Sequence, residues 1–127
     1  MVDDSFNTNE QTFPKSIRLL TQREFDDVHA SNHFAADATL VLKAIANNTK
    51  TTRLGLSIGR KVGNAVVRNR WKRLIRESFR KQKNELPSGL DIVVRPRKGA
   101  KCDYSAIDQS LRLLSQKIHR RIQKGAK

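Results

Sequence analysis

One segment of the sequence combines a helical apolar stripe with a high density of positive charge. From Ala65 to about Lys83, at ~100° per residue, apolar residues fall on one side of a predicted helix and cations on the other. The apolar side carries Val67, Trp71, Leu74, Ile75 and Ser78. The opposite side carries Asn69, Lys72, Arg73, Arg76 and Arg80, with Arg68 and Arg70 on the flanks. Because Glu77 is the only acid between Arg60 and Lys83, the like charges repel, and the pattern predicts a polyanionic partner.

A glycine-bracketed basic turn, residues 59–63, precedes this helix, and Asn64 is its predicted N-cap. Backbone amides at such a turn and at a helix N-terminus can hold a phosphate. A flexible connector is the alternative, and Arg60 and Lys61 favour the anion site.

The overall charge supports a nucleic-acid partner. The chain has 127 residues, enough for one domain with a modest core, and 26 Lys and Arg against 12 Asp and Glu give a net charge of +14. This excess of positive charge indicates nucleic acid as the first candidate partner and an anionic membrane surface as the second. Apolar runs are too short to span a bilayer, and the acidic N-terminus does not resemble a secretory signal. The lone Cys102 suits a reducing compartment, so we expect a cytoplasmic protein.

The N-terminal third predicts a disordered extension followed by a short helix. Residues 1–12 are polar and aperiodic, so we expect the single domain to span residues 13–123, with residues 124–127 frayed. Thr21 and Glu24 form a predicted capping box. The helix should cover residues 22–30, with Leu20, Phe25 and Val28 as its apolar contacts.

The remaining periodicities predict strands and a final helix. Residues 38–45 and 53–58 are typical of a β-hairpin, and residues 33–35 suggest a short extra strand. A strand over residues 90–95 is followed by a basic loop, residues 97–101. A last helix should run from its N-cap Asp103 to about Gln123. Its apolar stripe is Tyr104, Ile107, Leu111, Leu114, Ile118 and Ile122.

These elements indicate an α/β chain of the two-layer α+β sandwich type. The order is helix, two or three strands, helix, strand, helix. One central sheet covered by helices on one face is the economical way to bury the apolar stripes.

The residues from Gly55 to Arg76 also carry a family resemblance. This run includes Gly59-Arg60-Lys61-Val62-Gly63-Asn64 and the triplet Arg68-Asn69-Arg70, and it resembles the RNR motif of the bacterial ribonuclease P protein component. The resemblance covers residues 14–122, with weaker matches at Arg18-Leu19 and in residues 91–96. It implies a left-handed βαβ crossover, which the general preference for right-handed crossovers would not predict.

The resemblance implies a division of labour within a ribonucleoprotein. The RNA subunit would cleave precursor tRNA with Mg²⁺, while the protein, without catalytic residues or a cofactor of its own, would bind the RNA subunit and the 5′ leader. Neither a membrane nor an obligate protein partner is expected. The residues expected to bind RNA are Arg60, Lys61, Asn64, Arg68, Asn69, Arg70, Lys72, Arg73 and Arg76.

The same resemblance places the leader in a cleft between the first helix and the sheet. Phe25 matches an aromatic position of the family, His29 stands at a second one, and Lys43 would extend the cleft if it faces that way. A glycine usual after the helix is Asn32 here, a residue that tolerates left-handed backbone geometry. Core packing is an equally weighted role for Phe25.

The sequence offers weaker signals for a metal site, a catalytic site and other functions. His33 and His119 have no ligand-spaced partner, and the adjacent Asp26 and Asp27 are more typical of a surface than of a magnesium site. No nucleophile, base and orienting group can be assembled. A structural RNA-binding module, such as a small ribosomal protein, and a DNA-binding protein are the rival functions. A DNA-binding helix-turn-helix would need a partner helix where the sequence predicts strands.

Overall fold

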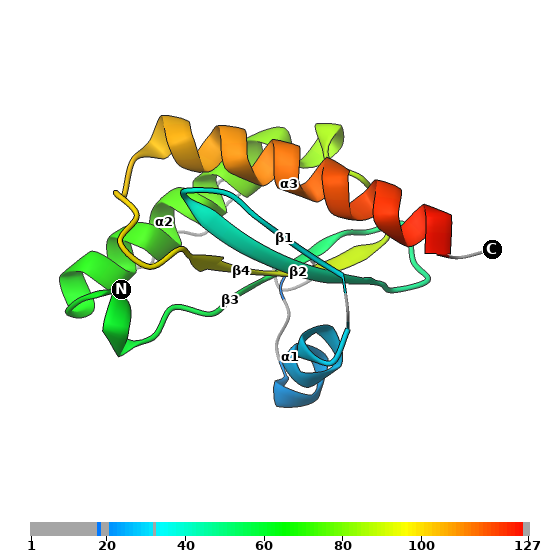
Figure 1. Cartoon of the computed structure of the whole chain (residues 1–127), viewed down its shortest axis with the longest axis horizontal. Helices are drawn as coiled ribbons and strands as arrows, with labels where there is room; N and C mark the ends of the chain where they lie inside the picture. The colour runs from blue at the N-terminus through cyan, green and yellow to red at the C-terminus, as the bar shows by residue number, and fades with distance from the viewer. Residues whose placement is uncertain (1–17, 19–20, 32, 126–127) are drawn as a thin grey trace, which may run out of the picture.

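The fold consists of three α-helices and one four-stranded sheet (Figure 1). The computed structural model describes residues 18, 21–31 and 33–125, so the predictions for residues 1–12, Leu20 and Asn32 lie outside the described residues. The elements are α1 (Gln22–His29), β1 (Phe34–Ala36), β2 (Leu40–Ala46), β3 (Arg53–Leu56), the 3-10 helix η2 (Arg60–Val62), α2 (Ala65–Gln82), the 3-10 helix η3 (Lys83–Glu85), β4 (Leu90–Pro96) and α3 (Tyr104–Gly125).

The strand order is β1-β2-β4-β3, so the predicted β-hairpin is wrong. β2 pairs with β1 and with β4, antiparallel in both cases, and β3 pairs with β4 in parallel. β4 therefore lies between the two strands that were expected to pair. The short extra strand is confirmed as β1, because Phe34 pairs with Lys43 at the sheet edge.

β4 takes the central position because both of its faces are covered, one by the main core and the other by α1. Residues 90–94 are all buried, whereas β3 carries Gly55 and has only four residues. A strand buried on both faces gains most from neighbours on both edges. β3, α2 and β4 form a parallel βαβ unit, and the left hand of this crossover stays a prediction from the resemblance.

The main core lies between one face of the sheet and the helices α2 and α3 (Figure 1). Its largest fully buried side chains include Phe79, Leu40, Leu42, Ile75, Ile92, Ile107, Leu111 and Ile118. The predicted stripes of both helices are confirmed in their centres, where Trp71, Ile75 and Ile118 are buried. The prediction for α2 missed Phe79, and it placed Val67 inside although that side chain is 37% exposed.

Helix α1 lies on the opposite face of the sheet, which corrects the expectation that helices cover one face only (Figure 1). Val28 and Phe25 pack against Val93 and Ile45, whose side chains alternate with those that face the main core. This apolar cluster is small, so polar contacts contribute to fixing α1 on the sheet.

The predicted helix starts are confirmed at α1 and α3. Thr21 Oγ1 accepts from the Glu24 amide at 3.1 Å, and the Glu24 carboxylate accepts from the Thr21 amide at 3.0 Å, which completes the capping box. Asp103 Oδ2 accepts from the Ala106 amide at 2.9 Å. α3 continues to Gly125, two residues past its predicted end.

Candidate nucleic-acid-binding surface

The start of α2 is built by a side-chain cap and a tight turn. Asn64 Oδ1 accepts from the Val67 amide at 3.0 Å, which confirms the predicted N-cap. The preceding turn is η2, closed by the Gly63 amide donating to the Arg60 carbonyl at 3.2 Å. A Cβ at Gly63 would lie 2.9 Å from Val67 Cβ, so a larger residue would push the turn away from the helix. Local sequence therefore fixes how Arg60 and Lys61 are presented beside the helix N-terminus.

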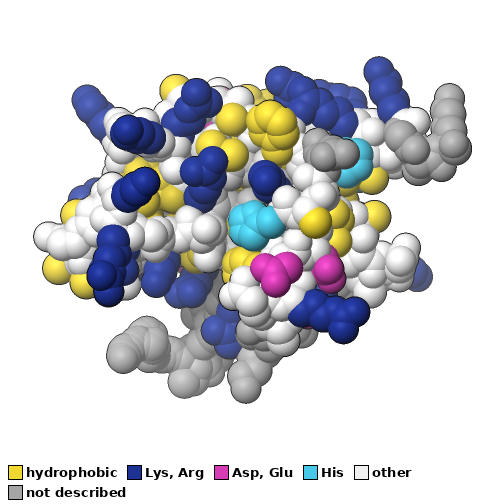
Figure 2. Space-filling view, turned by 60° about the horizontal axis from the view of Figure 1, so that its bottom comes forward, with side chains coloured by type: hydrophobic (Ala, Val, Ile, Leu, Met, Phe, Trp, Pro, Cys, Tyr) yellow, Lys and Arg dark blue, Asp and Glu magenta, His cyan; other side chains and the backbone are white. Residues whose placement is uncertain are grey.

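The structure brings the predicted RNA-binding residues together at this end of the molecule. They occupy η2 and the first two-thirds of α2, and the exposed ones are Arg60, Lys61, Asn64, Asn69, Arg70 and Arg73. Lys72 and Arg68 are half-buried, and Arg68 Nε donates to the Gly63 carbonyl at 3.2 Å. Figure 2 shows Lys and Arg side chains over this end.

The carboxylates that the structure describes leave this surface uncompensated. Within the described part of the chain, none of these cations is in an ion pair. The one acid of α2, Glu77, accepts instead from Arg80 at 3.0 Å and pairs with Lys81 at 3.3 Å. Burial raises the pKa of Glu77, but these two partners outweigh it and the pKa ends below its usual range. The positive face thus has the charge that a phosphate backbone would neutralise.

Arg76 departs from the predicted outward arrangement. Its side chain is half-buried, and its pKa is lowered first by burial and second by the positive charge of Arg18. Arg18 forms an isolated parallel bridge with Leu54 on the outer edge of β3, and its Nε is buried without a hydrogen-bond partner. Arg76 therefore lies near the sheet edge rather than on the open face of α2.

The loop after β4 extends the cationic surface, which sequence reasoning did not include in the site. Arg70 and Arg73 of α2 act electrostatically on Cys102, where their charge lowers a thiol pKa that burial raises more strongly. The loop therefore lies beside α2, and its Lys98 and Lys101 are exposed. The run of basic residues over 97–101 was the available sequence signal.

The three leader candidates lie together where α1 meets the sheet. Lys43 lies opposite Val93 on the face that α1 covers, and its Nζ donates to the His29 carbonyl at 3.3 Å. His29 is exposed, whereas Phe25 is half-buried against Val28 and Val93. Phe25 thus packs in the small cluster while retaining some exposed surface.

Phe34 is an aromatic residue near this site that sequence reasoning missed. It is the direct β1 partner of Lys43, so both side chains project from the same face of the sheet. Its side chain is 53% exposed, which is unusual for a large aromatic group. The sequence signal that could have indicated this site was an aromatic residue within the predicted short strand, residues 33–35.

An ion-pair network that links α1 to β3 and β4 helps to hold α1 on this face of the sheet. Arg53 of β3 makes a two-point contact with Asp91, with Nε–Oδ1 at 2.9 Å and Nη2–Oδ2 at 2.7 Å. Its Nη1 contacts Glu24 Oε2 of α1 at 2.8 Å. The two carboxylates raise the pKa of Arg53, although burial opposes them. At the other end of α1, Ser31 Oγ donates to the Ala44 carbonyl at 3.2 Å.

Comparison with known proteins decides the family. A family model described as Ribonuclease P matches residues 13–119. The chain is a member of the ribonuclease P protein family.

Two curated relatives cover most of the chain. The "Ribonuclease P protein component" of Lachnoclostridium phytofermentans is 41% identical over 106 residues, which cover 83% of this chain and 90% of the relative. The protein of the same name from Petrotoga mobilis is 39% identical over 100 residues, which cover 79% of this chain and 85% of the relative.

Solved structures of the family have the same fold. The Staphylococcus aureus RNase P protein matches with a TM-score of 0.71 and 34% identity, over 83% of this chain and 96% of that one. The Thermotoga maritima RNase P protein matches with a TM-score of 0.69 and 32% identity, over 78% and 96%. The mixed α and β architecture is therefore that of ribonuclease P proteins, and membership implies a part in tRNA processing.

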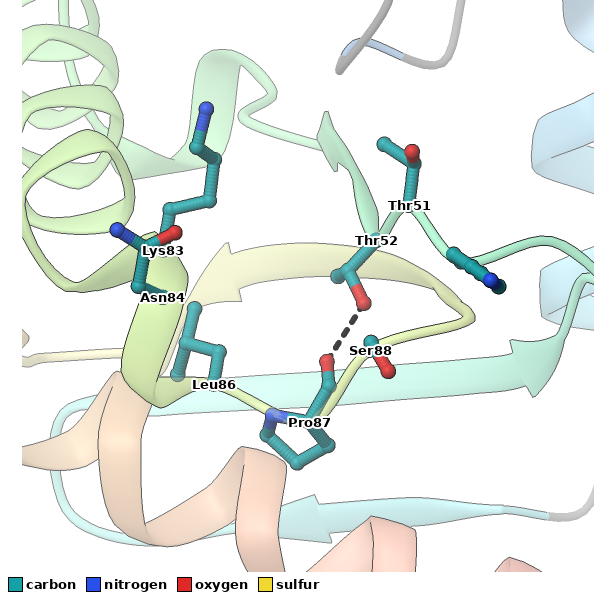
Figure 3. A pocket seen from close by; sticks show the side chains of 8 residues that line it. Thr51, Thr52, Lys83, Asn84, Leu86, Pro87 and Ser88 are labelled. Atoms are coloured by element: carbon teal, nitrogen blue, oxygen red, sulfur yellow. Dashed lines mark hydrogen bonds between the residues drawn. The ribbon is translucent and has the colours of Figure 1, made fainter.

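This ribonuclease P family member also has a hollow away from the cationic surface. A pocket of ≈ 410 Å³ opens between the β2–β3 loop and the α2–β4 loop (Figure 3). Thr52 Oγ1 donates to the Pro87 carbonyl at 2.6 Å and joins the two loops. The pocket contains none of the predicted site residues. Among the described residues, no group of three His, Cys, Asp or Glu can hold a metal, and no helix could cross a membrane.

Proposed function

We propose that this protein is the protein subunit of ribonuclease P and binds the catalytic RNA subunit through η2, the start of α2 and the 97–101 loop. The uncompensated cations at the capped start of α2 carry the proposal. Arg guanidinium groups can fork onto phosphate oxygens, Lys acts as a point charge, and amides at the helix N-terminus add donors. Family membership favours this function over the ribosomal and DNA-binding alternatives.

We further propose that the 5′ leader of precursor tRNA lies along the sheet face beside α1. His29, Phe25 and Phe34 offer rings for base stacking, and Lys43 offers a charge for the backbone. Endonucleolytic removal of the leader gives the mature 5′ end. The RNA subunit supplies the chemistry with Mg²⁺ in the cytoplasm, and the protein alone does not cleave.

Reconstitution tests this function directly. Purified protein added to a bacterial ribonuclease P RNA at low magnesium should restore leader cleavage, while protein alone should leave precursor tRNA intact. Absence of any stimulation would contradict the proposal.

Paired variants locate the RNA-subunit surface. Arg68→Gln/Arg70→Gln should weaken assembly with the RNA subunit by at least ~10-fold, since each lost phosphate contact removes counterion release. Lys50→Gln/Lys83→Gln, at the pocket beyond the other end of α2, removes the same charge and should have a small effect. Equal affinity of the α2 variant and the unmodified protein would refute the surface assignment.

The leader site needs a different measurement. Phe34→Ala and Lys43→Gln should reduce the ratio of holoenzyme affinities for precursor and mature tRNA, with RNA-subunit affinity unchanged. Lys83→Gln, at an exposed position of η3 beyond the end of α2, is the control. A ratio that stays constant in both leader variants would remove the leader from this face.

A further inference from the structure

The C-terminal half of α3 carries a second row of cations that the proposed function does not use. Lys117, Arg120, Arg121 and Lys124 are all exposed. Their spacing of three, four and seven residues places them along one face of the helix. We call these four residues the α3 cationic row.

The described part of the protein provides no carboxylates for this row. The sequence has no Asp or Glu after Asp108. That residue pairs with Arg112 at 3.5 Å, so the first half of α3 is compensated and the second half is not. Among the described residues, no ion pair involves the row, although Arg121 Nη1 donates to the Phe34 carbonyl. Lys117, Arg120 and Lys124 therefore remain available to an external anion.

The row lies far from the start of α2. α3 has 22 residues, about 33 Å at ~1.5 Å per residue, and its first turns contact the last turns of α2 through Asp108 and Gln82. Its C-terminal end and the N-terminal end of α2 lie at opposite ends of the molecule (Figure 1). Figure 2 shows Lys and Arg side chains along the edge that leads to the C-terminus, apart from those over the start of α2.

We propose that Lys117, Arg120 and Lys124 form a second phosphate-binding surface, which contacts an RNA segment different from the one bound at the start of α2. This inference rests on the proposed RNA-binding function. The protein would then join two parts of a folded RNA, or the RNA subunit and the precursor tRNA, across its long axis.

RNA fits this surface better than a membrane does. A helix that binds a bilayer surface needs an apolar face beside its cationic face. The apolar face of α3 is used in the core, where Ile107, Leu111 and Ile118 are fully buried. Leu113, at 51% exposure, is the one large apolar residue that α3 exposes. A single such residue is too small an apolar surface to anchor the helix in lipid.

Two lysine pairs provide a matched test. Lys117→Gln/Lys124→Gln removes two charges from the row, and Lys50→Gln/Lys83→Gln removes two from the pocket region, with circular dichroism to check folding. The row variant should bind RNA about 10-fold more weakly, and its slope of log affinity against log salt should be smaller by about 1–2. The control should lose less than about threefold. Lys117→Arg/Lys124→Arg should restore the affinity.

Two arms identify the RNA. Affinity for the ribonuclease P RNA alone reports contact with that subunit, and affinity of the assembled holoenzyme for precursor tRNA reports contact with the substrate. A loss in either arm supports the proposal. Equal losses in the row variant and the control would show a response to net charge only and overturn it.

The remaining outcomes separate this inference from the proposed function. Unchanged binding by the row variant, together with a loss in Arg68→Gln/Arg70→Gln, would refute the second surface and leave the proposed function intact. A loss in the row variant alone would make α3 the RNA site and refute the α2 assignment. Binding to anionic phospholipid vesicles that only the row variant loses, with RNA affinity unchanged, would assign the row to a membrane.

Discussion

At the scale of single residues, Cys102 is a built-in reporter of RNA binding. It is the only cysteine of the chain, and it lies half-buried near Arg70 and Arg73. Burial raises its thiol pKa, so alkylation by iodoacetamide should be slow at pH 7 and should accelerate as the pH approaches the raised pKa. Bound RNA would cover the site and neutralise the two arginines, which raises the pKa further. We expect alkylation, followed by mass spectrometry, to slow at least several-fold with saturating RNA.

The unfolded chain controls for this measurement. In denaturant, Cys102 loses its shielding, so RNA should not alter the rate. Full reactivity of the folded protein at saturating RNA would mean that RNA does not cover the part of α2 near the 97–102 segment.

Arg53 has a different role, because it balances a buried charge. Asp91 is almost fully buried and accepts from both Arg53 and Asn47. Arg53→Met should cost about 2–4 kcal/mol in the free energy of unfolding, since it leaves that carboxylate partly unpaired. Urea unfolding measures the loss. Arg95→Met, at an exposed position of β4, should change stability by less than about 0.5 kcal/mol.

At the scale of elements, the cap of α2 predicts a modest and local loss. Asn64→Ala removes the acceptor for the Val67 amide and should destabilise the protein by about 1 kcal/mol. Asn69→Ala, at an exposed position inside the same helix, should leave stability unchanged or slightly raised. Thermal unfolding of both variants distinguishes the cap from a general effect of losing an amide. Equal shifts in both would contradict the capping role.

Helix starts were predictable because their signals are local. Thr21 with Glu24, Asn64 and Asp103 each act within three residues of themselves. The order of the strands was not predictable in this way. β2 and β3 are consecutive and separated by turn residues, which is typical of a hairpin, but β4, more distant in sequence, lies between them. The unbroken apolar run of residues 92–94 was the sign in the sequence of a central strand. The predicted exposure of Arg76 was wrong for a similar reason. Its side chain lies near Arg18, which is distant in sequence.

At the scale of the whole molecule, the charge excess predicts an unusual salt response. With a net charge of +14 and few ion pairs among residues 21–31 and 33–125, self-repulsion opposes the compact state. Raising salt from about 0.05 to about 0.5 M should therefore raise the midpoint of thermal unfolding, because screening weakens that repulsion. Sodium chloride, rather than a strongly excluded salt such as sulfate, keeps the result electrostatic. A midpoint that falls with salt would show that favourable ion pairs dominate.

The position of β4 also affects how the protein is made. Ribosomes deliver β2 and β3 before the strand that joins them, so a nascent chain holds two open edges with no partner for either. The sheet closes only when residues 90–96 emerge, since this strand bonds to both neighbours. Truncation between Leu56 and Leu90 would therefore leave the β1–β2 pair and β3 without the strand that joins them. Synthesis past Pro96 is the step that commits the chain to its native topology.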